Sequence, residues 1–181
     1  MTEIIEAIDA WTLDRYAAYK TKLYGFSELI HVTAGEGSVE QIFPATYDNR
    51  EKVTINDKYS FITWMRWQSP ATYENNEQWN FGAEDARFAV LPLRLVLIHK
   101  SDLGEDLCFD FVNNLPSKLT VSGYKFVFVK PEFSVDPDHD AIIQQELGPA
   151  NYLVYEKHRF KWNVYVINIT CEFIACESLT P

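Results

Sequence analysis

A nearly continuous apolar run at residues 87–99 constrains the fold more than any other feature of the sequence. In a β-strand, successive side chains point to opposite faces of the sheet. A run that is apolar at almost every position therefore predicts a strand that is covered on both faces. Pro92 interrupts the run and has no N–H to donate, which predicts that the first half of the strand lies at a sheet edge or a bulge.

The N-terminal part of the chain changes from a helical to a strand period. Apolar residues three or four apart predict an amphipathic helix over residues 2–23, which the sequence Thr-Leu-Asp at 12–14 can divide into two pieces. From Glu28 the period is two, and the two glycines within residues 34–38 predict a β-hairpin over residues 29–43.

The remaining elements are predicted from period, capping residues and breakers. They are strands at 52–55 and 59–67, a helix at 101–115 ended by Pro116, a strand at 124–130, a short helix between Asp136 and Gly148-Pro149, and two strands within 151–174 separated by a polar break at 156–159. This order predicts an α+β fold, a mainly antiparallel sheet with an N-terminal helix and two further helices packed on it. The 181 residues contain no repeat or linker, so we expect a single domain over 1–181.

A long polar segment at residues 68–86 shows neither a strand nor a helical period. Connections of this length are uncommon in small domains and often bind a partner. Five large aromatic residues lie in or near it: Trp64, Trp67, Tyr73, Trp79 and Phe81. Tryptophan and tyrosine dominate the energetics of protein interfaces, so this aromatic loop is a candidate contact element. In the alternative interpretation these rings simply cover an open end of the sheet.

No arrangement of residues predicts a catalytic, cofactor or metal site. Each of the four histidines lacks a partner at acid–base or ligand spacing. The acidic string at residues 136–140 fails the calcium-loop pattern, because Ala141 and Leu147 stand where glycine and glutamate are needed. The three cysteines are expected to be free thiols; they are Cys108, Cys171 and Cys176. We therefore expect a protein that is not an enzyme and needs neither a cofactor nor a metal.

The charge and hydropathy patterns exclude further classes of function. With 16 Lys+Arg against 26 Asp+Glu, the formal charge is −10, which repels phosphates and disfavours tight nucleic-acid binding. No stretch of 18 apolar residues predicts a membrane span, and the first residues lack the basic and apolar regions of a signal peptide. We therefore expect synthesis in a reducing cytoplasm, without export and without a membrane partner.

The order of the predicted elements resembles that of the small ring-forming proteins of tailed bacteriophages, of the tail-terminator or head-to-tail connector type. Those proteins have an N-terminal helix (here residues 2–23), a β-hairpin with a mobile loop (29–43), a central strand followed by a helix (88–115), and closing strands. The low content of glycine and the high content of tyrosine and phenylalanine resemble the composition of phage structural proteins. The acidic, aromatic composition resembles that of proteins of the crAss-like phages of gut bacteria.

The resemblance implies a structural virion protein, assembled in the host cytoplasm, whose copies form a homo-oligomeric ring in the neck of the particle. Its partners are then other copies, portal or tail proteins, and DNA that passes through the channel without specific binding, for which an acidic lumen is suited. The hairpin 29–43, with unpaired strand edges, and the loop 68–86 are the expected contact elements.

Eight residues are the candidate interface: His31, Ile42, Phe43, Trp64, Trp67, Tyr73, Trp79 and Phe81. The alternative function, from a different class, is a soluble cytosolic binding module that uses the aromatic loop to hold a peptide or a carbohydrate.

Overall fold

The computed structural model describes residues 2–32, 41–69, 72–74, 86–121, 127–133 and 139–176. In chain order the elements are α1 (Thr2–Arg15), β1 (Thr21–Val32), β2 (Gln41–Thr46), β3 (Phe61–Trp67), β4 (Thr72–Glu74), β5 (Ala86–Lys100), η2 (Ser101–Leu103), α2 (Asp106–Asn114), β6 (Lys118–Leu119), β7 (Val127–Phe133), α3 (His139–Lys157), η3 (Arg159–Lys161) and β8 (Trp162–Cys176). None of the helices in these ranges is both long and apolar enough to span a membrane.

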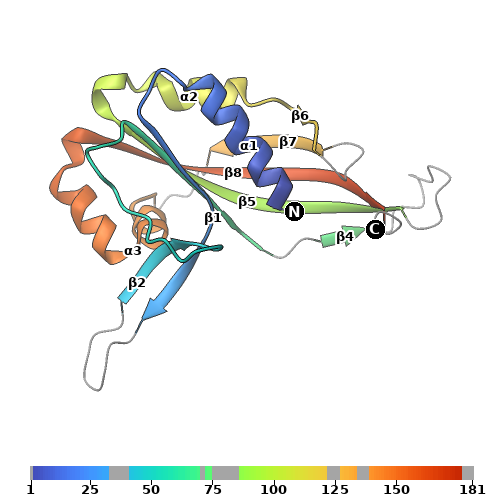
Figure 1. Ribbon diagram of the computed structural model, residues 1–181, viewed down its shortest axis with the longest axis horizontal. Coiled ribbons are helices and arrows are strands. Elements are labelled where there is room, and N and C mark those ends of the chain that lie inside the picture. Colours follow the sequence, from blue (N-terminus) through green and yellow to red (C-terminus); the bar gives the residue numbers. More distant parts are fainter. Residues whose placement is uncertain are drawn as a thin grey trace.

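The strands form one sheet in the order β2-β1-β3-β5-β8-β7-β6, with β4 also paired to β5 (Figure 1). Among the strand pairs of the described chain, only β1 and β3 run parallel. Helices α1 and α2 cover one face of the sheet, and α3 covers part of the other (Figure 1). The predicted α+β class with a mainly antiparallel sheet is therefore confirmed.

Strand β5 is the centre of the fold, as its apolar sequence predicts. Leu93, Leu95 and Leu97 are buried against α1 and α2, while Val96 and Ile98 are buried beneath α3. The strand pairs with β3 on one side and with β8 on the other. Both of its faces and both of its edges are thus occupied by other elements of this chain.

Pro92 marks neither a sheet edge nor a register shift in the ladder with β8, so the prediction of an edge or a bulge was wrong. It lies inside the sheet, opposite Thr170 of β8, and its carbonyl accepts a hydrogen bond from the Gln68 N–H on the other side. A residue in a strand directs its N and its carbonyl to the same side. The missing N–H of Pro92 therefore falls where β3 has ended at Trp67 and β4 has not yet begun at Thr72.

We had expected the N-terminal helix to extend to Leu23, but it ends at Arg15. Tyr16 leaves the helix as a buried ring that stacks on Phe61, with a centroid distance of 4.8 Å. From Thr21 the chain pairs with β3 instead. Long-range strand pairing has overridden a spacing that also suits a helix, which is a common outcome for a short segment.

Two predicted strands are absent from the described chain. Residues 52–55 form only one bridge, between Ala45 and Lys52, and not a strand. Residues 151–155 belong to α3, because Gly148 (φ 70°) only kinks the helix and Pro149 begins its second half. Proline is well suited to the first turn of a helix, where its missing N–H costs nothing. The Gly-Pro pair therefore joins two helical segments where we had expected a stop.

Candidate functional site

The hairpin formed by the ends of β1 and β2 leaves the body of the sheet. Pairing of β1 with β3 ends at Phe26↔Met65, whereas β1 remains paired with β2 out to Val32↔Gln41. Gly25 adopts φ +63° at the register shift that precedes this departure. Figure 1 shows the two strands projecting from the rest of the molecule. We call residues 27–32 and 41–46 the hairpin arm.

A cavity of about 420 Å³ lies beside the outer half of the hairpin arm, between the arm and α3. It is lined by Leu29, His31, Ile42, Ala141, Gln144, Gln145, Gly148 and Pro149. Two of the candidate interface residues, His31 and Ile42, lie opposite each other in the strand register and both line this cavity. The third candidate in the arm, Phe43, is half-buried and has the Lys52 ammonium 4.6 Å from its ring centre.

The outer edge of β2 is covered from Pro44 to Thr46, the half of the strand that follows the predicted hairpin 29–43. The Pro44 carbonyl accepts from the Val53 N–H at 2.8 Å, and the Thr46 N–H donates to the Glu51 carbonyl at 2.9 Å. Pro44 itself has no N–H to offer, a common protection of edge strands. A neighbouring molecule therefore meets side chains of the arm rather than a free strand edge at these positions.

The candidate aromatic residues outside the arm do not form one surface. Trp64 is fully buried in the core beneath α3, so its assignment to the interface was wrong. Trp67 is half-buried and packs edge-on against Phe26, at 5.1 Å between ring centres. Tyr73 belongs to β4, whose backbone pairs with β5, and its side chain is outside the described part of the structure. The remaining candidates, Trp79 and Phe81, lie outside the described residues.

The segment from the second half of α3 to η3 exposes large apolar side chains that sequence reasoning missed. Leu153, Val154 and Phe160 are exposed, and Phe160 most of all, at 74%. Residues 151–155 had been assigned to a strand, in which Leu153 and Val154 would have pointed to opposite faces. The available signal was proline directly after Gly148, which is typical of a new helix start as well as of a helix end.

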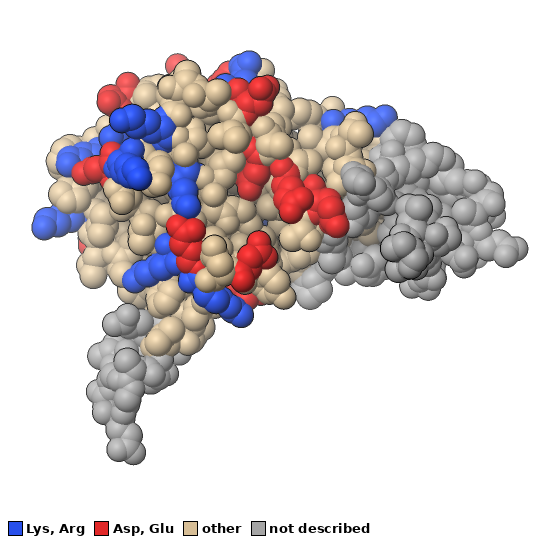
Figure 2. Space-filling model, in the orientation of Figure 1, with Lys and Arg blue, Asp and Glu red and all other residues tan. Residues whose placement is uncertain are grey.

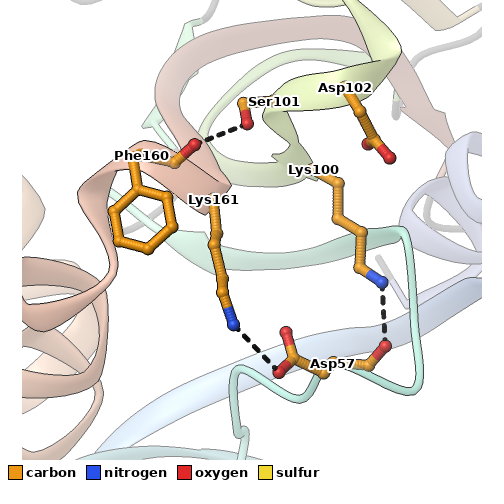
Figure 3. A pocket seen from close by; sticks show the side chains of 6 residues that line it. All are labelled: Asp57, Lys100, Ser101, Asp102, Phe160 and Lys161. Carbon is orange, nitrogen blue, oxygen red and sulfur yellow. Dashed lines mark hydrogen bonds and ion pairs between the residues drawn. The ribbon is translucent and has the colours of Figure 1, made fainter.

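Phe160 borders a pocket of about 420 Å³ at the end of β5 (Figure 3). Lys100 and Lys161 approach Asp57 from two different elements: the Lys100 ammonium donates to the Asp57 carbonyl at 3.0 Å, and Lys161 Nζ lies 3.7 Å from Asp57 Oδ2. The Ser101 hydroxyl donates to the carbonyl of Phe160 at 2.7 Å, which ties η3 to the end of β5. Asp57 and Asp102 line the same pocket, so its two ammonium groups are accompanied by two carboxylates around one exposed aromatic ring.

A buried ion cluster joins α3 to the sheet. Glu146 on α3 is fully buried and accepts hydrogen bonds from Arg66 Nη2 at 2.6 Å and Arg94 Nη1 at 2.8 Å. The two arginines are directly opposite each other on β3 and β5. A buried carboxylate held by two guanidinium groups fixes the position of α3, and hence one wall of the cavity beside the hairpin arm.

Several titratable groups are shifted by burial. Desolvation raises the pKa of both the Cys108 and the Cys171 thiol to about 12, and both thiols are free. Burial lowers the pKa of His99, whose Nδ1 lies 3.0 Å from the Lys100 carbonyl. Thiols that stay protonated are poor nucleophiles. Within the described ranges, no three His, Cys, Asp or Glu side chains are grouped so that they could hold a metal ion.

Asp9 on α1 is expected to make stability depend on pH. Desolvation, with a smaller contribution from Glu6, raises the pKa of Asp9 from 3.8 to about 7. Because the folded-state pKa is the higher one, the stability that this carboxyl contributes is complete below pH 4 and is lost as the pH rises through 7. Asp9→Asn should therefore gain stability relative to wild type over that range, on the order of 2 kcal/mol after allowance for partial exposure.

Urea unfolding of both proteins at pH 4.5 and pH 8 measures this difference. Asp14→Asn, at an exposed position of the same helix, is the matched control. It keeps Asp9, so its difference in stability from wild type should be similar at the two pH values. A difference between Asp9→Asn and wild type that is equal at the two pH values would contradict the raised pKa.

Comparison with models of protein families, with curated proteins and with solved structures finds no match to this chain. The surfaces described above are therefore the basis for inferring its function.

Proposed function

We propose that this protein is a structural virion protein of a tailed bacteriophage, a subunit of a homo-oligomeric ring in the head-to-tail region. The hairpin arm carries this proposal. It parts from β3 after Phe26, so that its outer part packs on α3 of its own chain, next to Gly148, and not on β3. A neighbouring subunit packed on the arm would bury the side chains that remain exposed there.

The exposed side chains of the arm region support a contact with another subunit. Val32 at the end of β1 is 40% exposed, and Tyr47, directly after β2, is 52% exposed. Fully burying a side chain of this type contributes roughly 1.5–3 kcal/mol. The cavity lined by His31 and Ile42 in the outer half of the arm can receive an apolar side chain of a neighbour.

A ring also needs a second, different surface on each subunit, because a head-to-tail contact joins unlike patches. The second half of α3, with Leu153 and Val154, supplies exposed apolar side chains that do not belong to the arm. The net charge of −10 suits a channel through which DNA passes without sticking.

Negative-stain electron microscopy and mass photometry of the purified chain, alone and with neck proteins of the same phage, test the proposal. We expect closed rings of one subunit number. Val32→Lys changes the arm. Its controls are Val112→Lys, at a half-buried position of α2, and Glu132→Lys, at an exposed position of β7. Val32→Lys should lose the rings but keep the circular dichroism spectrum of wild type, whereas Glu132→Lys should keep both. Val112→Lys should change the spectrum, and so shows what a folding defect looks like in these measurements.

A chain that remains monomeric in dilute solution, at high concentration and with the neck proteins would contradict the proposed function. If Val32→Lys still forms rings, the hairpin arm does not make the contact between subunits, and the argument from the arm to a ring fails.

A further inference from the structure

One end of the molecule gathers lysine side chains in an otherwise acidic chain. Hydrogen bonds hold this end together: the Ser60 N–H donates to the Lys20 carbonyl, and the Lys100 N–H donates to the Ser60 carbonyl. Lys161 joins them through Asp57. We call Lys20, Lys22, Lys58, Lys100 and Lys161 the lysine-rich end.

The positive charge of the lysine-rich end is only partly neutralised. Lys22 Nζ pairs with Glu51 at 3.0 Å, and Lys161 pairs with the carboxylate of Asp57. In the described part of the chain, no carboxylate lies within ion-pair distance of Lys20 or Lys58. Both side chains are exposed. The lysine-rich end therefore has ammonium groups to offer to an acidic partner.

The exposed face of α1 has the opposite character. Its residues at helical spacing are Glu3, Glu6, Ala10, Leu13 and Asp14, and all five are exposed. Figure 2 shows acidic side chains along the position of α1, and basic side chains interspersed with acidic ones in the left part of the view. Leu13, near the C-terminal end of the row and beside Asp14, is 54% exposed. An exposed apolar side chain next to a carboxylate is the counterpart of Phe160 next to Lys161.

These two surfaces do not meet within one copy of the chain. The 14 residues of α1 extend about 21 Å, and Glu6 lies in the half of the helix that is remote from Lys20. Among the described ion pairs, none joins α1 to a lysine of this end. Contact of the whole acidic row with the lysine-rich end would therefore require a second molecule, and because the patches differ it would be a head-to-tail contact.

We infer that the lysine-rich end is the docking surface for α1 of a second copy, with Leu13 of one subunit against Phe160 of the next. This inference rests on the proposed ring and names the subunit contact within it. Charge complementarity of this kind accelerates association and fixes the partner and its orientation. The contact should also weaken as salt rises, since exposed charges are screened.

Charge reversal on each surface tests the inference. Glu6→Lys and Lys58→Glu should each weaken self-association at least tenfold, measured by sedimentation velocity at low salt. The two changes combined in one chain should restore association to within about threefold of wild type, because the pair is again complementary. Glu132→Lys on β7 is the control: it is exposed, alters the net charge as Glu6→Lys does, and should leave association unchanged.

The outcomes separate this inference from the proposed function. If wild type forms rings and the variants Glu6→Lys and Lys58→Glu form them equally well, the docking of α1 is overturned but the proposed ring is not. A wild type that never self-associates, with or without neck proteins, would refute the ring and the docking together. If wild type binds heparin, Lys58→Glu abolishes that binding, and self-association is unchanged, then the lysine-rich end holds a polyanion and the inference is wrong.

Discussion

Replacing Glu146 with alanine is expected to lower the free energy of unfolding by about 3–5 kcal/mol. The carboxylate is fully buried between Arg66 and Arg94, and both arginines are largely buried themselves. Removing one partner of a buried ion cluster leaves charges that neither water nor protein compensates. Urea unfolding at pH 7, followed by circular dichroism, measures the loss.

Glu156→Ala provides the matched control, because Glu156 is an exposed glutamate in the second half of the same helix. Exposed substitutions of this kind change stability by roughly 0.5 kcal/mol or less. If Glu146→Ala loses less than about 1 kcal/mol, the two arginines reach water in the variant, and the cluster does not fix α3 on the sheet.

Gly148→Ala is expected to cost about 3 kcal/mol, for two physical reasons that can be separated. The residue has φ 70° and ψ 159°, a backbone conformation that is essentially restricted to glycine. In addition, a Cβ at this position would lie 2.6 Å from the Ile42 carbonyl oxygen and 3.0 Å from Phe43 Cα in the hairpin arm. Backbone atoms cannot move aside as the end of a side chain can, so α3 and the arm would have to separate.

Gly104→Ala isolates the first of these reasons. Gly104 has nearly the same conformation, φ 89° and ψ 148°, but a Cβ there would meet nothing within 4 Å. We expect a loss of about 1–2 kcal/mol from backbone strain alone. The excess loss in Gly148→Ala measures the contact between α3 and the arm. Equal losses in the two variants would show that this contact is looser than described.

Local sequence patterns predicted two kinds of element correctly. These are elements that pair with a neighbour close in sequence, and elements whose composition suits a single type of secondary structure. The hairpin was recognised from its period and its glycines, and β5 from a run apolar on both faces. The helix before Pro116 was predicted as well, although it begins at Asp106 rather than near Ser101. In each case, period and breakers gave the same answer.

The errors in the fold arose where distant residues decided the local structure. Residues 21–23 have helical spacing but pair with β3, some 40 positions along the chain. Residues 151–155 are rich in aromatic and apolar residues, yet they form a helix in which Tyr152 and Tyr155 pack against the core beneath α3. Neither outcome is encoded in a short window of sequence, because the deciding contacts are tertiary.

The candidate interface stays a prediction. His31 and Ile42 line one cavity, whereas Trp64 is a core residue and was assigned wrongly. Aromatic residue type alone does not distinguish a buried ring from an exposed one. The most exposed ring of the described chain, Phe160, follows a segment that had been assigned to the wrong kind of element, so sequence reasoning gave no reason to single it out.

The ladder between β5 and β8 has a consequence for how the chain acquires its structure. These strands pair from Ala86↔Cys176 to Lys100↔Trp162, and the connection between them contains α2, β6, β7 and α3. Closing so long a loop has an entropic cost that must be met before the pairing stabilises anything, which slows folding. On the ribosome, β5 must wait for β8 with its apolar faces incompletely covered. A nascent chain of this kind is vulnerable to aggregation, and chaperone demand should fall sharply once β8 has emerged.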